Sequence, residues 1–413
     1  MNSTDAEIVI VGGGPAGIMA TISAINNGNS VVLIEKNEKI GRKLYISGKG
    51  RCNVSNASEA QEFLSNVVSN PKFLSSAIRA FSPNNVTEFF ESRGVKLKVE
   101  RGNRIFPVSD KSSDIIDALY KELHNVGADL RLQERVVNIS KKNDIFYVKT
   151  SQNTYECDAV IVATGGKSYP KTGSNGEGYE FAKELGHSIV EIKPALAPIL
   201  LKSKVELPQG LSLKNVTAKI LDKTTNKTLA EDFGEMIFTD EGVSGPIVLS
   251  LSSRINRLDF NSITFAIDLK PALDHKQLDA RILRDFQQVS NKQFKNSLDA
   301  LLPKSMIPFI IELTGISPET TVNVINKEQR KKLVGLLKCL KFDVIGLAPL
   351  DEAIVTAGGV KVSEINPKTM ESKLVKNLYF AGEIIDVDAL TGGYNIQIAL
   401  STGYVAGRSI KEI

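Results

Sequence analysis

Three glycines near the start of the chain have the spacing of a turn that binds a dinucleotide. They are Gly12, Gly14 and Gly17, and they directly follow the run EIVIV at residues 7–11. In such a turn the first glycine lets the chain bend sharply, and the second lets the backbone approach a pyrophosphate. The third lets the next helix pack closely on the strand, and the N-terminus of that helix offers N–H groups and a positive dipole to the phosphates.

The segments around these glycines have the periodicity that such a turn needs. EIVIV is typical of a buried parallel strand, and Pro15 is tolerated in the first turn of a helix. Gly28 ends the helical pattern, and SVVLIE at residues 30–35 indicates a second strand. The apolar residues at helical spacing are Ile18, Ile22 and Ile25. We therefore predict a strand–helix–strand unit over residues 7–35.

Glu35 ends the second predicted strand and lies 18 residues after Gly17. A carboxylate there can accept hydrogen bonds from both hydroxyls of an adenosine ribose, and it would repel a 2′-phosphate. The unit is therefore unsuited to NADP, while the glycines alone leave NAD and FAD equal. An empty turn of the same geometry is the alternative interpretation.

Two more glycine-rich segments have the features of a cofactor site. The strand at residues 159–163 leads into Thr164-Gly165-Gly166, a second point of close backbone approach. TGGYN at 391–395 precedes a C-terminal helix, whose N-terminus would direct N–H groups at an anion or a polarised ring edge. Gly392 and Gly393 leave room for a flat ring, although either segment alone is also typical of an ordinary turn.

Composition excludes several classes of protein. The 413 residues fit two or three domains, and 42% apolar and 24% charged residues are ordinary soluble values. The net charge of +4, without a Lys/Arg block, predicts neither nucleic-acid nor membrane binding. The cysteines and histidines lack metal-ligand spacing, so we predict no metal site. They are Cys52, Cys157, Cys339, His124, His187 and His275.

The same features favour a cytoplasmic protein. The cysteines form no CxxC pair, which indicates a reduced compartment. The N-terminus lacks a basic region, and no apolar run approaches the roughly 18 residues of a membrane span. The sequence does not reveal the oligomeric state.

The sequence pattern changes near residues 190 and 345. Residues 191–273 have the pattern of short strands, as in GEMIFTDEGVSGPIVLS, and residues 274–344 are mostly helical in pattern. From about residue 345 the sequence again shows alternating strand and helix patterns. We therefore predict a dinucleotide-binding domain of residues 1–190 and 345–413, interrupted by a β-rich domain at 191–273 and a helical domain at 274–344.

GGGPAG, Glu35, ATGG at 163–166 and LYFAGE at 378–383 together resemble the FAD enzymes of the glutathione-reductase-like two-dinucleotide class. Longer stretches, among them GRKLYISGKGRCNVSN at 41–56 and AGEIIDVDALTGGYNIQIALSTGYVAG at 381–407, resemble a narrower family. It comprises bacterial NAD(P)/FAD-dependent oxidoreductases described as aminoacetone-oxidase-like or bile-acid-reductase-like. The resemblance covers nearly the whole chain and implies an α/β FAD-binding Rossmann-like domain with an inserted β-barrel-like and helical region.

The resemblance also implies a set of cofactor-binding residues, taken by position. Those for the pyrophosphate are Gly12, Gly14, Pro15, Ala16 and Gly17. Those for the adenosine diphosphate are Glu35 at its ribose, Lys36, Arg42, Lys43, Val136 at adenine, Ala163, Thr164 and Gly165. Those along the isoalloxazine are Ser47, Gly48, Arg51, Cys52 and Asn53. Those at the ribityl chain are Gly382 with either Glu383 or Asp386. Those whose N–H groups would face flavin N1 and O2 are Gly393, Tyr394, Asn395 and Ile396.

This placement has a chemical reason. Reduced flavin carries negative charge near N1, and a helix N-terminus there would stabilise that charge. The chain has no second GxGxxG, so NADH or NADPH would visit the flavin briefly as a donor without a Rossmann module of its own. We therefore expect FAD as the bound cofactor.

The expected function is an oxidoreductase. NAD(P)H would reduce FAD, which would pass hydride to a small or hydrophobic organic substrate or to oxygen. The alternatives are a flavin-dependent tRNA-modifying enzyme, which predicts a basic groove, and a non-catalytic redox sensor that uses Cys52. No catalytic acid or base is evident, and the candidates by location alone are Tyr45, Arg51, Tyr169, Asp240 and Tyr394. Asp240 also departs from the family pattern, where His is frequent.

Overall fold

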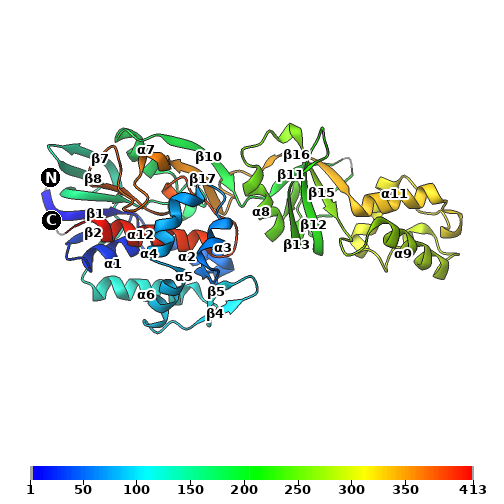
Figure 1. Cartoon of the computed structure of the whole chain (residues 1–413), viewed down its shortest axis with the longest axis horizontal. Helices are drawn as coiled ribbons and strands as arrows, with labels where there is room; N and C mark the ends of the chain where they lie inside the picture. Colours follow the sequence, from blue (N-terminus) through cyan, green and yellow to red (C-terminus); the bar gives the residue numbers. More distant parts are fainter. Residues whose placement is uncertain (1–2, 204, 412–413) are drawn as a thin grey trace. The chain divides into compact units, whose positions relative to one another are not determined.

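The computed structural model describes residues 3–203 and 205–411, and over these residues the chain divides into two compact units. The first, called the sheet unit, comprises residues 1–195 and 350–413, and the second, the barrel unit, comprises 196–349 (Figure 1). The division predicted at 273–274 falls inside the barrel unit, where strands and helices share one hydrophobic core. Among the described residues, no helix is long and apolar enough to cross a membrane.

The described part of the sheet unit is built on a seven-stranded sheet. Its order is β6 (Asp129–Arg131), β2 (Val31–Ile34), β1 (Ser3–Val11), β9 (Thr154–Val162), β8 (Ile145–Thr150) and β7 (Val136–Lys142), and β18 (Leu378–Phe380) also pairs with β9. The pairs that join β6, β2, β1, β9 and β18 are parallel, and those that join β9, β8 and β7 are antiparallel. All four residues of β2 are buried, as expected for a strand covered on both faces.

Helices and two smaller sheets complete the sheet unit. The helices are α1 (Pro15–Ile25), α2 (Arg42–Ile46), α3 (Ala60–Ser65), α4 (Ser75–Ala80), α5 (Pro83–Glu91), α6 (Ser112–Asn125), α7 (Glu177–Glu184) and α12 (Tyr394–Ser409). The smaller sheets are β3 (Ser55–Asn56), β5 (Arg104–Pro107) and β4 (Leu97–Glu100), and β10 (Ile189–Ala195) with β17 (Val355–Val360).

Glycines let α1 and α12 approach each other until backbone touches backbone. A Cβ atom at Gly403 would lie 2.2 Å from the carbonyl oxygen of Ala16, and one at Gly407 would lie 2.2 Å from that of Ala20. Figure 1 shows the two helices side by side, blue beside red. Segments from the two ends of the described chain therefore form one layer of the sheet unit.

The barrel unit is a closed barrel with helices packed on it. Its strand order is β11 (Ile199–Lys202), β14 (Gly242–Ser244), β13 (Thr228–Phe238), β12 (Ser212–Asp222), β15 (Ile263–Asp268) and β16 (Leu340–Leu347), and β16 pairs back to β11. Its helices are α8 (Pro246–Ile255), α9 (His275–Gln288), α10 (Ile307–Thr314) and α11 (Lys327–Lys338).

One predicted strand in this region was wrong. PIVLS, expected among the short strands, begins helix α8. Pro246 occupies the first turn, where its missing N–H costs nothing, and the buried Ile247, Leu251 and Ile255 recur at helical spacing. The apolar run PIVLS is too short to distinguish a helix from a strand, and the helical period becomes clear only when Leu251 and Ile255 are included.

The contact between α1 and α12 predicts that Gly407→Ala destabilises the sheet unit. The new methyl group would lie 2.2 Å from the oxygen of Ala20 and 2.9 Å from the nitrogen of Ala24, and overpacking of this kind costs about 1–3 kcal/mol. The measurement is the free energy of unfolding from urea denaturation followed by circular dichroism.

Gly335→Ala in α11 is the matched control, because no heavy atom lies within 4 Å of its Cβ position. We expect this variant to gain about 0.5–1 kcal/mol from the smaller backbone entropy of alanine. Equal stability of the two variants would contradict the inferred close contact.

Candidate functional site

The carboxyl ends of the parallel strands lie at one edge of the sheet. β1 leads into Gly12, β2 into Glu35, β9 into Ala163, and β18 into Ala381 and Gly382. Because these strands are parallel neighbours, the segments that follow them meet at that edge. This is where open α/β sheets bind ligands.

The three glycines of the first turn differ in what surrounds them. Gly12 has a φ of 110°, and a Cβ there would lie 2.5 Å from the oxygen of Ala163. A Cβ at Gly17 would lie 1.9 Å from the oxygen of Gly12. Gly14, by contrast, has no heavy atom within 4 Å of its Cβ position. Gly12 and Gly17 therefore serve close packing, and Gly14 borders open space at the N-terminus of α1.

The carboxylate of Glu35 is held at the rim of this turn. Its Oε2 accepts from the backbone N–H of Gly13 at 2.7 Å, and its Oε1 accepts from the backbone N–H and the side-chain amide of Asn37 at 2.8 and 2.6 Å. Lys36 pairs with Glu177 at 2.8 Å, and Arg42 donates to the side-chain oxygen of Asn37 at 2.9 Å. These basic side chains are therefore already bonded to protein groups next to the turn.

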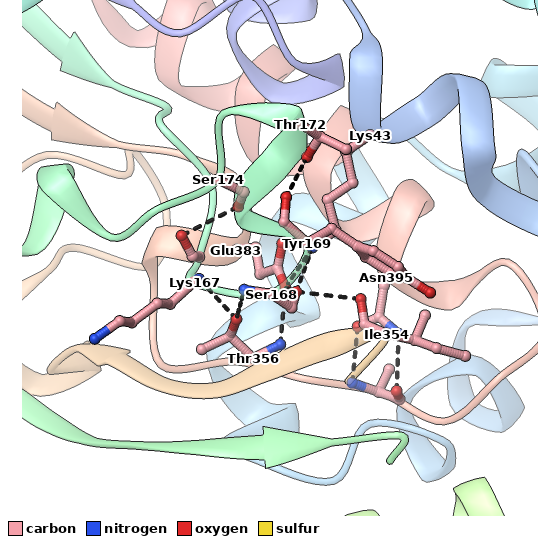
Figure 2. A network of polar contacts seen from close by, with 12 residues as sticks. Lys43, Lys167, Ser168, Tyr169, Thr172, Ser174, Ile354, Thr356, Glu383 and Asn395 are labelled. Carbon is pink, nitrogen blue, oxygen red and sulfur yellow. Dashed lines mark hydrogen bonds and ion pairs between the residues drawn. The ribbon is translucent and has the colours of Figure 1, made fainter. Parts of the chain in front are cut away.

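A polar network joins α2, the loop after β9, β17 and the segment after β18 (Figure 2). Lys43 Nζ donates to Ser168 Oγ at 2.6 Å and to Glu383 Oε2 at 2.7 Å. Glu383 Oε1 also accepts from the backbone N–H of Thr356 at 2.8 Å. The Thr356 hydroxyl accepts from the backbone N–H groups of Lys167 and Ser168 at 2.8 and 3.0 Å.

The structure gives Glu383 and Asp386 different surroundings. The Glu383 carboxylate accepts from three groups of this network, and its side chain is 18% exposed. Asp386 is buried, and its Oδ2 accepts from the amide of Asn70 at 3.0 Å. Gly382 precedes them with a φ of 78°, and its N–H donates to Thr402 Oγ1 at 2.9 Å. The choice between the two carboxylates for the ribityl chain stays a prediction.

The loop at residues 47–53 combines a strained backbone with one unsatisfied acceptor. Gly48, Lys49, Gly50 and Cys52 all have φ between 57° and 80°, a region that side chains rarely adopt. Asn53 Oδ1 is buried and makes no hydrogen bond with the described residues. Buried polar atoms are almost always paired in proteins, so this oxygen is suited to a donor on a ligand.

Arg51 extends from this loop to acidic residues. Its guanidinium contacts Glu100 and Asp110 and lies 4.1 Å from the ring centre of Phe106. Hydrogen bonds to the two carboxylates raise the pKa of Arg51. The pKa of Asp110 is lowered by hydrogen bonds from Lys98 and Arg51. Arg51 therefore anchors the loop at residues 47–53 to the segment at residues 100–110.

The start of α12 is suited to a flat anionic group. Gly393 caps the helix with a φ of 95°, and a Cβ there would lie 2.2 Å from the oxygen of Ser55 and 2.8 Å from Asn53 Oδ1. Asn395 closes the preceding loop, because its side chain exchanges hydrogen bonds with the backbone of Ala389 at 3.0 and 2.8 Å. The first N–H groups of a helix have no partners within it, so they face outward here.

The other predicted cofactor residues lie in the sheet unit. Ala16 is buried, and a Cβ at Gly382 would contact its methyl group at 2.8 Å. Thr164 Oγ1 is a second buried oxygen without a hydrogen bond among the described residues. The remaining positions are Pro15 in the first turn of α1, Ser47 bonded to the oxygen of Leu44, buried Val136 at the start of β7, Gly165 with a φ of 75°, and half-buried Ile396.

These features fit FAD at the carboxyl edge. The open space at Gly14 with the N-terminus of α1 suits a pyrophosphate, and Glu35 suits a ribose. The buried acceptor of Asn53 and the N-terminus of α12 suit the hydrogen-bonding groups of a flavin, and the buried Thr164 oxygen lies among the residues predicted for the adenosine diphosphate. In the described part of the chain, no group of His, Cys, Asp or Glu side chains has the arrangement of a metal site.

The five candidates for acid or base chemistry have distinct surroundings. Tyr45 is 58% exposed, and Asp240 is exposed in the barrel unit between β13 and β14. Tyr394 is buried with its ring 5.0 Å from that of Phe63, and Arg51 is ion-paired. Tyr169 is half-buried beside the Lys43–Glu383 pair, and burial raises its pKa.

Sequence reasoning missed Ser168 and Thr356, which hold the network together. They are far apart in the chain, and neither belongs to a motif with recognisable spacing. The one local signal near Ser168 is Pro170 in the segment SYP, which is typical of a loop.

The chain matches known proteins over nearly its full length. A family model described as "HI0933-like protein Rossmann domain" matches residues 6–409. A 3-dehydro-bile acid delta(4,6)-reductase of Clostridium scindens is 31% identical over 98% of this chain and 99% of its own. A ribosomal RNA dihydrouridine synthase of Escherichia coli is 29% identical over 98% of both chains. The resemblance to a bile-acid-reductase-like family is confirmed.

Solved structures show the same fold at low sequence identity. The open form of a flavocytochrome c3 fumarate reductase has a TM-score of 0.52 at 18% identity, over 98% of this chain and 78% of its own. A 3-ketosteroid-delta4-(5alpha)-dehydrogenase of Rhodococcus jostii has a TM-score of 0.51 at 14% identity, over 98% and 96%. The predicted Rossmann-like FAD fold with an inserted barrel is thus confirmed.

The open space at Gly14 predicts that Gly14→Ala weakens FAD binding without destabilising the apoprotein. Its methyl group touches no protein atom but would occupy the space assigned to the pyrophosphate. We expect the Kd for FAD to rise at least about tenfold, about 1.4 kcal/mol. The measurements are a fluorescence titration with FAD and thermal unfolding of the apoprotein.

Gly12→Ala is the comparison variant for this test. Its φ of 110° and the 2.5 Å approach to Ala163 predict a loss of both stability and FAD affinity. Unchanged FAD affinity in Gly14→Ala would place the pyrophosphate away from this turn.

The buried thiols predict selective alkylation. Burial raises the pKa of both Cys52 and Cys157 to about 12, so about one thiol in 10,000 is ionised at pH 8. Cys339 is partly exposed. We expect iodoacetamide at pH 8 to modify Cys339 first in the folded protein, as mapped by peptide mass spectrometry. Rapid labelling of Cys52 would instead show that its thiol is accessible and ionised in the folded protein.

Proposed function

This chain belongs to the HI0933-like family of Rossmann-domain flavin-dependent oxidoreductases, and we propose that it reduces a carbon–carbon double bond conjugated to a carbonyl group. FAD would be the bound cofactor, and NADH or NADPH would be the transient hydride donor. The chain is an oxidoreductase by family, so a non-catalytic redox sensor is not its function.

The observation that carries this proposal is the chemistry common to the relatives' names. A 3-dehydro-bile acid with 4,6-unsaturation has double bonds conjugated to a ketone, and its reductase saturates them. Dihydrouridine is uridine whose ring double bond, conjugated to a carbonyl group, has been reduced. Two relatives that cover 98% of this chain thus differ in substrate while sharing a reaction type.

The residues of the sheet unit support this reaction. A helix N-terminus at Gly393 suits the negative charge of reduced flavin near N1 and O2. The oxygens of Asn53 and Thr164 offer acceptors to donors of the cofactor. The sequence analysis also expected transfer of hydride to oxygen, and the experiment described below distinguishes the two reactions.

Two substrate classes follow from the relatives: a steroid-like enone and a uridine in RNA. The near-neutral net charge of the whole sequence predicts no nucleic-acid partner. RNA as a second candidate substrate class is supported instead by the ribosomal RNA dihydrouridine synthase that is 29% identical over 98% of this chain. If the substrate is a uridine in RNA, its ring double bond would be reduced. The tRNA-modifying alternative considered from the sequence does not specify this reaction.

The proposal predicts two separable half-reactions in the purified protein. Under anaerobic conditions NADH or NADPH bleaches the visible absorbance of FAD. Added 4-androstene-3,17-dione, or a uridine-containing RNA, then restores that absorbance. Mass spectrometry detects a product that has gained two hydrogen atoms.

The matched control acceptor is 5α-androstane-3,17-dione, which has the same ring system without the conjugated double bond. It should leave the flavin reduced. If neither unsaturated acceptor reoxidises the flavin and air alone does, the protein is an oxidase and the proposed reaction is wrong.

A further inference from the structure

Tyr169 lies in the loop after β9, at the carboxyl edge of the sheet and within the network of Figure 2. Its neighbour Ser168 accepts a hydrogen bond from Lys43, and the Lys43 ammonium lies 6.0 Å from the centre of the Tyr169 ring. Lys43 is among the residues predicted at the adenosine diphosphate, and Glu383 is one of the two carboxylates predicted at the ribityl chain. Tyr169 is therefore placed beside that site.

The backbone of Tyr169 is held in an unfavourable conformation. Its φ is 53°, in the left-handed region that bulky residues rarely adopt. The backbone oxygen of Tyr169 accepts from the hydroxyl and the N–H of Thr172 at 2.7 and 2.9 Å. On the other side, Thr356 Oγ1 binds two successive N–H groups, including that of Ser168. Strain maintained by so many contacts is typical of functional sites, and here it fixes the direction of one aromatic side chain.

The hydroxyl of Tyr169 has no hydrogen-bond partner among the described residues, and the Tyr169 side chain is half-buried. Burial raises the pKa of this phenol, which keeps it protonated at neutral pH. The Lys43 ammonium, by contrast, is occupied by Glu383 and Ser168.

Resting on the proposed function, we propose that Tyr169 is the acid that protonates the substrate during reduction of the double bond. When bound, FAD supplies a hydride, obtained from NAD(P)H, to the substrate carbon β to the carbonyl. The Tyr169 hydroxyl then gives its proton to the α carbon, so the double bond gains one hydride and one proton. The resulting phenolate recovers a proton from water.

Tyr169→Phe tests this role because it removes the hydroxyl and keeps the ring. We expect NAD(P)H to bleach the bound FAD at a rate within about twofold of the unmodified protein. Reoxidation of the reduced flavin by 4-androstene-3,17-dione should slow by at least about 100-fold, as expected for loss of a general acid. Both rates are measured separately by anaerobic stopped-flow absorbance.

Tyr120→Phe on α6 is the matched control, since that tyrosine is 40% exposed and makes its ring contact with His124. Both of its half-reactions should be unchanged. FAD content and thermal unfolding are compared in all three proteins, so that a folding defect is detected.

Each other outcome overturns the assignment. Equal reoxidation rates in Tyr169→Phe and the unmodified protein would leave the proposed function standing and exclude Tyr169 as the acid. Loss of FAD or of folding from Tyr169→Phe would make this hydroxyl a binding or structural group. If the unmodified protein shows no reoxidation by enone or RNA, the proposed function fails, and the role of Tyr169 with it.

Discussion

The sheet unit depends on contact between backbone atoms around α1. The helix lies against Gly12 through Gly17, against Gly382 through Ala16, and against α12 through Gly403 and Gly407. At each of these points a side chain would displace backbone or the methyl group of Ala16, because the Cβ position lies 1.9–2.8 Å from the nearest atom. This close packing fixes the N-terminus of α1 beside the second half of α12, so the N-termini of the two helices are held at a set separation. The two ends of the proposed flavin site are therefore fixed by the same set of contacts.

The ion pair between Lys43 and Glu383 holds a different part of the sheet unit together. It joins α2 to the segment after β18, and through Ser168 and Thr356 it also fixes the loop after β9 and strand β17. An isolated exposed pair contributes little, but these side chains are only 28% and 18% exposed and share several hydrogen bonds. The pair thus determines the local order of loops that the sheet alone would leave independent.

Much of this fold could be predicted from local sequence patterns, whereas the contacts between residues far apart in the sequence could not. The β1–α1–β2 unit followed from glycine spacing and apolar period, because each of its contacts is close in sequence. Glu383 was predicted as one of two candidates at the ribityl chain, but its pairing with Lys43, 340 residues away, was not predicted because no local pattern couples them. Arg51 was expected along the isoalloxazine, and its contacts with Glu100 and Asp110 depend on the β4–β5 hairpin. Helix α8 was missed because Pro246, a good first-turn residue, resembled a break between strands.

The pairing of α1 with α12 has a consequence for biosynthesis. A ribosome releases the glycine turn at residues 12–17 long before residues 394–409, which complete the same layer. The barrel unit is continuous in sequence and has its own core, so it can fold while the sheet unit still lacks its last helix. Meanwhile the face of α1 that packs on Gly403 and Gly407 has no partner. The time needed to synthesise residues 26–393, which include the whole barrel unit, thus sets how long that face is exposed.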